Sequence, residues 1–200
     1  CSANNGAPTM TNDAQRRIPE FIAGPLGFLF TLRHHILFAV AVFGTGAVIG
    51  TSMTGLPDAV IQSFFDLAQQ LKTKNGFELT VFILTKNALA AIIAIYGGFL
   101  LGLFPFFAAF LNGMVMGRVV AMQPESLWMV LPHGIFELTA IFIAWGVGFW
   151  CAGWWRDPPR LERLQERAQA SLLLFGLIVM PLLAVAAVIE ATGIKLLTGT

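Results

Sequence analysis

The sequence predicts an all-α membrane protein: a polytopic bundle of about five transmembrane helices, with one further amphipathic helix outside the membrane. This fold class is predicted by the composition and by the pattern of apolar stretches. Of the 200 residues, 56% are hydrophobic and 12% are charged, whereas soluble domains are about 45–50% apolar and about 25% charged. Mean hydropathy is +0.75. Because too few polar residues remain to cover a water-facing surface, lipid must face most of this chain.

The chain divides into a polar N-terminal part and one transmembrane domain. Residues 1–17 are small and polar, which predicts a disordered tail. The following stretch, up to residue 32, contains prolines and is interpreted as an interfacial approach to the membrane. Residues 33–200 are then expected to form a single helical domain.

Five apolar stretches are long enough, or nearly long enough, to cross a bilayer, which needs about 20 residues. They cover residues 33–53, 77–103, 104–120, 127–155 and 170–194. The first stretch reaches the required length only when Arg33 is counted at the interface, where a long side chain can reach toward water. The fourth closes on three tryptophans typical of a membrane interface, and Pro181 interrupts the last.

Residues 57–73 have a different pattern. Apolar residues recur there at helical spacing while Asp, Gln and Lys occupy the opposite side. This predicts an amphipathic helix that lies on the membrane or packs over the bundle.

Whether residues 104–120 cross or re-enter decides between five and four spans. Arginines precede the first span and occur again in the loop 156–167. Positively charged loops stay on the cytoplasmic side. An even number of crossings must therefore separate these clusters, which makes 104–120 a crossing. The expected location is a prokaryotic cytoplasmic membrane, with the N-terminus and the loop 156–167 in the cytoplasm.

Ionisable groups within apolar spans are the candidate functional residues, because burying them in lipid is costly. His133 and Glu137 are one helical turn apart and share a face, and Pro132 is expected at the first helical turn. The pair is either a proton or ion site at a helix start or a hydrogen-bonded pair that fixes helix packing.

Three further polar residues in the spans need partners. Asn87 and Asn112 can cap broken helix ends or bond across to Glu137. Lys86 can reach the outer interface or pair with Glu137 or Glu78, and Glu190 is expected at an interface.

Glycines at a spacing of four residues predict close helix contacts. The candidates for packing are Gly98, Gly102, Gly113, Gly117 and Gly134, beside further sets at Gly44, Gly46 and Gly50 and at Gly146 and Gly148.

Several classes of function are not indicated. The net charge of +1 suggests no nucleic acid, and no phosphate-binding or metalloprotease motif occurs. The two cysteines, Cys1 and Cys151, have no metal-binding spacing, so no metal or cofactor is expected. Cys1 is either the mature end of a lipoprotein or simply where the chain begins.

The stretch from Asn87 to Gly148 resembles the stage II sporulation protein M family. The resemblance rests on Asn87, Asn112-Gly113, the element Pro132-His133-Gly134 with Glu137, and the intervening glycines. It implies a polytopic bacterial or archaeal membrane protein. The sporulation member acts as a scaffold in forespore engulfment and recruits peptidoglycan-degrading partners. Many relatives live in organisms that do not sporulate, so the resemblance implies fold and location more than that role.

Two functions follow as hypotheses. The first is a non-enzymatic scaffold or accessory subunit of a membrane complex, whose partners are the lipid bilayer, other membrane or envelope proteins, and a second copy if the chain is a homo-oligomer. The second is a transporter or channel component that uses the His133 and Glu137 site. No nucleophile with an adjacent base is recognisable, so an enzyme is the least favoured.

Overall fold

The computed structural model describes residues 24–53, 75–124, 127–156 and 158–198. Its elements are helices: α2 (Pro25–Ser52), α4 (Gly76–Gly97), α5 (Leu103–Met122), α6 (Leu127–Cys151), the 3₁₀ helix η2 (Ala152–Trp155), α7 (Arg160–Leu174), the π-helix η3 (Phe175–Val179) and α8 (Met180–Thr198). In these ranges, five helices are long and apolar enough to cross a membrane. The predicted all-α membrane bundle is confirmed. The predicted tail (1–17) and amphipathic helix (57–73) lie outside the described residues.

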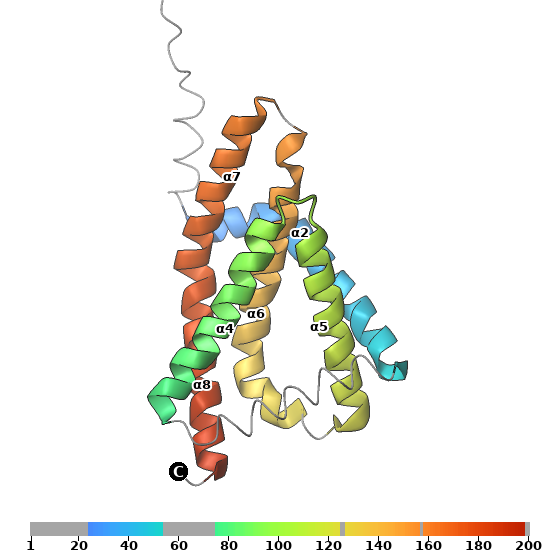
Figure 1. The fold of residues 1–200 in the computed structure, drawn as a ribbon, viewed down its shortest axis with the longest axis vertical. Coiled ribbons are helices and arrows are strands. Elements are labelled where there is room, and N and C mark those ends of the chain that lie inside the picture. Colours follow the sequence, from blue (N-terminus) through green and yellow to red (C-terminus); the bar gives the residue numbers. More distant parts are fainter. Residues whose placement is uncertain (1–23, 54–74, 125–126, 157, 199–200) are drawn as a thin grey trace, which may run out of the picture.

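Helix α2 begins at Pro25, well before the first span expected at residue 33. Proline suits the first helical turn because its missing N–H has no partner there in any case. The apolar residues that follow continue the helix, and Leu32 is buried. With 28 residues, α2 is about 42 Å long, which exceeds the roughly 30 Å hydrocarbon core. It runs obliquely past the other helices and ends near the C-terminal end of α5 (Figure 1).

The second and third spans are separated by a tight turn between α4 and α5. Helix α4 ends at Gly97, earlier than the expected residue 103, and Gly102 precedes α5 with a φ of 77°. Glycine accepts this left-handed conformation without a steric cost. Helix α5 then has 20 residues and is long and apolar enough to cross a membrane, as the crossing predicted for 104–120 requires.

Helix α6 begins at Leu127, so the expectation that Pro132 opens the span is wrong. Pro132 instead lies inside the helix, where it leaves the carbonyl of Trp128 without its usual i+4 donor. Helix α6 is the most buried of the spans: 44% of the residues in its most hydrophobic stretch are buried, against 22–28% in the other four spans. It is therefore the centre of the bundle, between α4 and α5 (Figure 1).

The last span is continuous with the helix before it. α7, η3 and α8 form one long rod in Figure 1, which differs from the expected interruption at Pro181. The irregularity is the π-helix at Phe175–Val179, just before this proline. Widening the turn accommodates a residue that cannot donate to the ladder, so the helix is locally widened but not broken.

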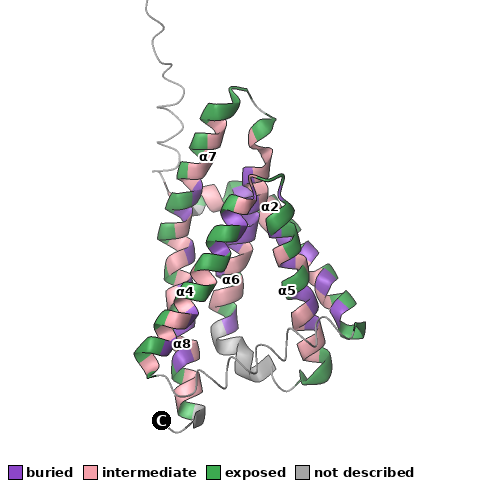
Figure 2. Ribbon diagram, viewed as in Figure 1, coloured by how far each residue is buried: buried purple, intermediate pink, exposed green. Residues whose placement is uncertain are grey.

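The buried residues form three clusters between helices. The largest joins α2, α4, α6 and the α7–η3–α8 segment; the second joins α2, α4, α5 and α6; the third joins α4 and α8. Figure 2 shows these buried residues on the inner faces of the helices. Large apolar side chains such as Phe30, Phe77 and Leu100 remain at least 60% exposed. Such an apolar exterior is what a lipid-facing bundle requires.

Candidate intramembrane polar site

The polar residues of α4 and α6 meet near the middle of the membrane spans. Asn87 Nδ2 on α4 donates a hydrogen bond of 2.9 Å to Glu137 Oε1 on α6, and both side chains are half-buried. Fifty residues separate the two in the sequence. A carboxylate and an amide that would each be costly alone in hydrocarbon thereby satisfy one another.

Lys86, the neighbour of Asn87, lies beside a different carboxylate. Its positive charge acts on Glu190 of α8, which is packed against α4. Its Nζ also lies 5.7 Å from the centre of the Phe82 ring. The sequence suggested the outer interface, Glu137 or Glu78 as the environment of Lys86, and Glu190 was expected at an interface. No signal in the sequence relates positions 86 and 190.

The remaining predicted polar residues are not brought into this group by the contacts described. Asn112 donates to the carbonyl oxygen of Ala108 in its own helix, at 2.7 Å, and is exposed. His133 belongs to α6, but its side chain lies outside the described residues. The described polar site therefore includes a hydrogen bond, Asn87 to Glu137, and an electrostatic interaction of Lys86 with Glu190, on three helices.

Glycines let α2 and α5 approach until their backbones touch. A Cβ atom built on Gly46 or Gly50 would overlap the carbonyl oxygens of Phe110 and Met114 on α5. A Cβ on Gly113 or Gly117 would in turn overlap the carbonyl oxygens of residues 43 and 47 on α2. Both helices thus present glycines four residues apart to one another, which is the small-residue contact of membrane helices.

The other predicted glycines lie at different contacts. A Cβ on Gly98 would overlap the carbonyl oxygen of Gly148, and a Cβ on Gly148 would lie 2.6 Å from the carbonyl oxygen of Ala94. The end of α4 is thereby held directly against α6. Gly102 is buried in the α4–α5 turn, and Gly134 is buried on α6. Gly44 has nothing within 4 Å.

Comparison with known protein families identifies the family of this chain. The family model described as Stage II sporulation protein M (SpoIIM) matches residues 25–193. The chain belongs to the SpoIIM family. The match begins at the first residue of α2 and ends within α8, so it covers all five candidate spans. Comparisons with curated proteins and with solved structures found no match.

This SpoIIM family chain has a second contact network, which sequence reasoning missed, at the end of the bundle where α6 meets α7. Arg167 of α7 donates to the carbonyl oxygen of Trp150, and its guanidinium lies 4.9 Å from the centre of the Trp150 ring. That ring contacts Phe28 of α2 edge-on at 5.3 Å. The charge of Arg167 also reaches His35 of α2. One arginine therefore joins the ends of three helices.

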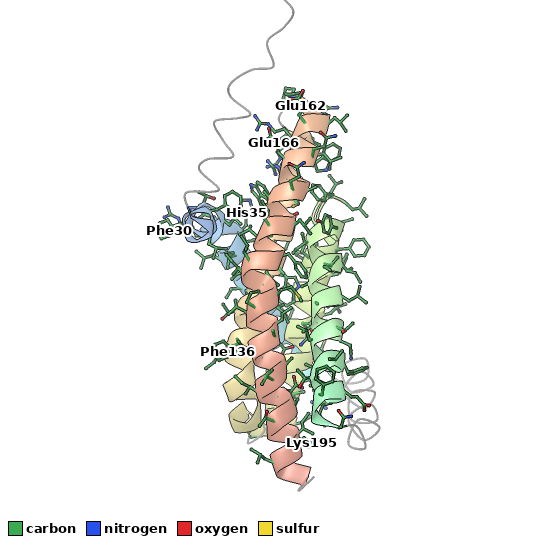
Figure 3. All side chains as sticks on the ribbon, turned by 90° about the vertical axis from the view of Figure 1, so that its left-hand side faces the viewer. Phe30, His35, Phe136, Glu162, Glu166 and Lys195 are labelled. Carbon is green, nitrogen blue, oxygen red and sulfur yellow. The ribbon has the colours of Figure 1, made fainter. Side chains whose placement is uncertain are left out.

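The ends of the bundle are distinct in charge. Figure 3 shows Glu162 and Glu166 at the tip of α7, His35 lower on the same half, and Lys195 at the opposite end. Trp154 Nε1 donates to the carbonyl oxygen of Phe99 at 3.0 Å, which ties the α4–α5 turn to the α7 end. The arginines of the α6–α7 connection lie at this end, and so does Arg33, since Phe28 of α2 contacts Trp150.

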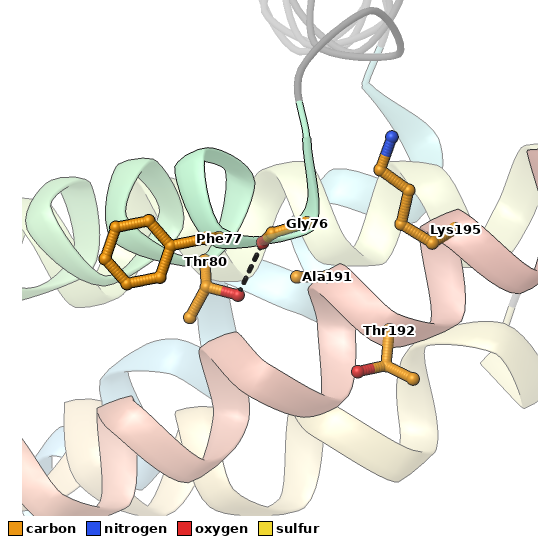
Figure 4. Close-up of a pocket in the computed structure, with 6 residues that line it drawn as sticks. All are labelled: Gly76, Phe77, Thr80, Ala191, Thr192 and Lys195. Carbon is orange, nitrogen blue, oxygen red and sulfur yellow. Dashed lines mark hydrogen bonds between the residues drawn. The ribbon is translucent and has the colours of Figure 1, made fainter. Parts of the chain in front are cut away.

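An open pocket of about 260 Å³ lies at the other end, between the start of α4 and the end of α8 (Figure 4). It is lined by Gly76, Phe77, Thr80, Ala191, Thr192 and Lys195. The Thr80 hydroxyl donates to the Gly76 carbonyl at 2.9 Å, so it is already engaged in its own helix. These lining residues include no carboxylate, imidazole or thiol. Within the described ranges, no group of three or more His, Cys, Asp or Glu residues could hold a metal ion.

Proposed function

We propose that this SpoIIM family protein is a non-enzymatic membrane scaffold or accessory subunit, which docks another membrane or envelope protein. The observation that carries the proposal is the projection of α7 beyond the ends of α4 and α5 (Figure 1). A helix that extends out of the membrane bundle supplies a surface that lipid does not cover.

The outer part of α7 supports this role. Its buried residues, Ser171 and Leu174, both lie in the last turn. The earlier turns expose polar side chains together with Leu161, which is 66% exposed. The Arg163–Glu166 ion pair of 2.8 Å lies along the helix and stabilises it locally. Leu161 is the large apolar side chain that the outer turns of α7 leave exposed, so it is the position at which docking on this surface can be tested.

The use of the intramembrane polar groups also favours a scaffold. Glu137 is bonded to Asn87, and Glu190 lies within the field of Lys86. Each contact joins two different helices, and hydrogen bonds between membrane helices contribute about 0.6–2 kcal/mol. Such contacts support a role in holding the bundle together.

The proposed location is a prokaryotic cytoplasmic membrane with the N-terminus and the segment 156–167, which includes the first half of α7, in the cytoplasm. Support comes from the clustering of Arg33, Arg156, Arg160, Arg163 and Arg167 toward one end, since positive segments remain cytoplasmic. In this orientation α7 projects into the cytoplasm, and its partner has a cytoplasmic surface.

A pull-down from native membranes tests the scaffold. The tagged chain is expected to retain a partner at fixed stoichiometry, and Leu161→Asp should abolish that retention without unfolding the bundle. Met122→Asp is the matched control, because Met122 is 50% exposed at the other end. Retention unchanged by Leu161→Asp, or lost equally with Met122→Asp, rules out docking on α7.

A transporter or channel component is the second candidate. The observation that favours it is an intramembrane carboxylate, Glu137, held by a hydrogen bond from Asn87, whose sequence neighbour Lys86 acts electrostatically on Glu190. Intramembrane ionisable residues commonly mark ion pathways. The sequence places His133 one helical turn from Glu137.

Flux measurements in liposomes separate the two candidates. A transporter should show proton- or ion-coupled flux that Glu137→Gln abolishes while the fold persists. In a scaffold, Glu137→Leu should weaken the fold less than Glu137→Ala, because leucine retains more of the side-chain volume. Equal folding of these two variants together with lost flux would identify a functional carboxylate.

A further inference from the structure

The side chain of Asn112, which ends in a carboxamide, is exposed at the middle of the membrane-spanning helix α5. Helix α5 runs from Leu103 to Met122, so Asn112 lies roughly 15 Å from either end along the axis. That depth is the centre of the hydrocarbon core. Asn112 is exposed, while the adjacent Gly113 is buried against α2. The amide thus faces away from the closest helix contact of the molecule.

The hydrogen-bonding capacity of Asn112 is only partly used. Its Nδ2 donates to the Ala108 carbonyl oxygen at 2.7 Å, and the described residues supply no donor to its Oδ1. A side-chain amide offers two donors and a carbonyl oxygen with two lone pairs. In hydrocarbon no water satisfies the remainder, and an unsatisfied polar group costs free energy of a few kcal/mol.

The residues around Asn112 form a face suited to helix packing. Ala108, Asn112, Val115 and Val119 follow one another at spacings of four, three and four residues, so they lie along one side of α5. Ala108, Val115 and Val119 are small or β-branched and half-buried, and Ala108 also packs against the cluster that joins α2, α4, α5 and α6. The neighbouring outward face carries bulky residues instead, with Phe104, Phe107 and Leu111 each at least 45% exposed. The Asn112 face is separate from the glycine face that contacts α2.

We propose that a second copy of this chain packs on the Asn112 face of α5, with the two Asn112 amides hydrogen-bonded to each other. A primary amide is self-complementary, because each copy presents a donor and an acceptor. Identical chains insert with the same orientation, so the symmetry axis of a dimer runs along the membrane normal and both amides lie at one depth. An unrelated helix would need a polar group at that same depth.

The arrangement is an isologous two-fold interface, in which the same patch faces itself. The heptad-like spacing of the face suits two α5 helices crossing at about 20°. A single buried asparagine at such a position also fixes register and the number of copies, as it does in coiled coils. The interface leaves the α2–α5 glycine contact intact within each copy.

Dilution in lipid vesicles tests the proposal with the full chain, using single-molecule subunit counting. The wild-type chain is expected to dimerise, and Asn112→Leu should raise the dimer dissociation constant about tenfold or more. Asn112→Gln should retain part of the dimer, since the amide is kept. Leu111→Ala is the matched control on the neighbouring face and should change nothing. Folding of every variant is checked by helical circular dichroism and a monodisperse elution profile.

Cysteine crosslinking provides an independent readout of the surface. In a Cys1→Ser background, Val115→Cys should form a disulfide-linked dimer, whereas Leu111→Cys should not; Cys151 is fully buried and serves as an internal blank. A monomeric wild-type chain, an unchanged dissociation constant in Asn112→Leu, or crosslinking of Val115→Cys to a different protein each overturns the proposal.

Discussion

At the scale of single residues, polar groups in this protein are placed where another helix can satisfy them. Asn87 and Glu137 meet across α4 and α6, and Lys86 and Glu190 approach across α4 and α8. In each case an intramembrane charge lies beside a group that offsets its loss of water. The sequence identified Asn87, Glu137 and Lys86 as needing partners, and offered Glu137 as one option for Asn87.

A double-mutant cycle measures the Asn87–Glu137 contact. Each single replacement by leucine should destabilise the bundle, and the double replacement should cost less than their sum. The expected coupling is about 0.6–1.7 kcal/mol, the range found for hydrogen bonds between membrane helices. Unfolding in mixed micelles provides the measurement, and strict additivity would show that the bond contributes nothing.

The Lys86 and Glu190 charges should be coupled in the same way. Lys86→Met removes a positive charge that acts on the Glu190 carboxylate, and Glu190→Leu removes a carboxylate on which that charge acts, so both should destabilise the protein. The double variant should recover much of the loss, because removing both charges also removes the cost of keeping them out of water. A double variant less stable than either single one would contradict this pairing. Thermal unfolding in detergent is the measurement.

At the scale of elements, the contact between α2 and α5 depends on glycine. Gly46 and Gly50 meet α5 backbone, and Gly113 and Gly117 meet α2 backbone, at separations that leave no room for a methyl group. Dispersion contacts between closely apposed backbones replace the hydrophobic effect, which is absent between helices in lipid. A single methyl group in this interface must push the helices apart.

Alanine substitution tests this interface directly. Gly117→Ala should destabilise the protein by about 1–3 kcal/mol, because overpacking shifts the backbone of α2. Gly44→Ala is the matched control: it lies on the same helix pair, yet its Cβ would meet nothing within 4 Å. The control should be neutral or slightly stabilising, since alanine is the better helix former. Equal effects of the two substitutions on detergent unfolding would contradict the proposed role.

Arg167 links α7 to the ends of α6 and α2 through the Trp150 carbonyl and ring. Arg167→Met should loosen α7 and increase hydrogen exchange in the η2–α7 connection. Arg163→Met is the control, because the side chain of Arg163 pairs with Glu166 inside α7. Protection that falls equally in both variants would show that α7 is not held through Arg167.

At the scale of the whole molecule, five candidate spans place the start of α2 and the α6–α7 connection at one end. The contacts of Trp150 with Phe28 and of Arg167 with Trp150 establish this proximity. The C-terminal ends of α2 and α5 lie at the other end of the bundle. The geometry agrees with the even number of crossings predicted from charge, and the positive-inside rule supports the proposal that this end is cytoplasmic.

Labelling with a membrane-impermeant thiol reagent tests the orientation. In a Cys1→Ser background, Leu161→Cys should react only from the cytoplasmic side and Met122→Cys only from the outside. Both positions are at least 50% exposed, and Cys151 is fully buried. Labelling of the two positions from the same side would refute the five-span topology.

Some of the structure could be read from composition and periodicity. The five spans, the crossing of residues 104–120 and the glycines of α5 followed from local sequence. Helix limits were less predictable: Pro25 begins α2 and Pro132 lies inside α6, because a proline is compatible with either place and only neighbouring contacts decide. The expected interruption at Pro181 is instead a π-helix at Phe175–Val179, because a widened turn can accommodate the proline without ending the helix.

The sequence by itself determined that lipid is the solvent of this chain, which stretches are long and apolar enough to cross a membrane, and which side chains are too polar to stay alone there. Those properties follow from local composition and do not depend on which helices pack against one another. Only the tertiary structure decided that Glu190 approaches Lys86, that Arg167 reaches Trp150, and that Gly46 and Gly50 complete the α5 interface. These pairs are distant along the chain, and which helix faces come together is fixed by packing of the whole bundle.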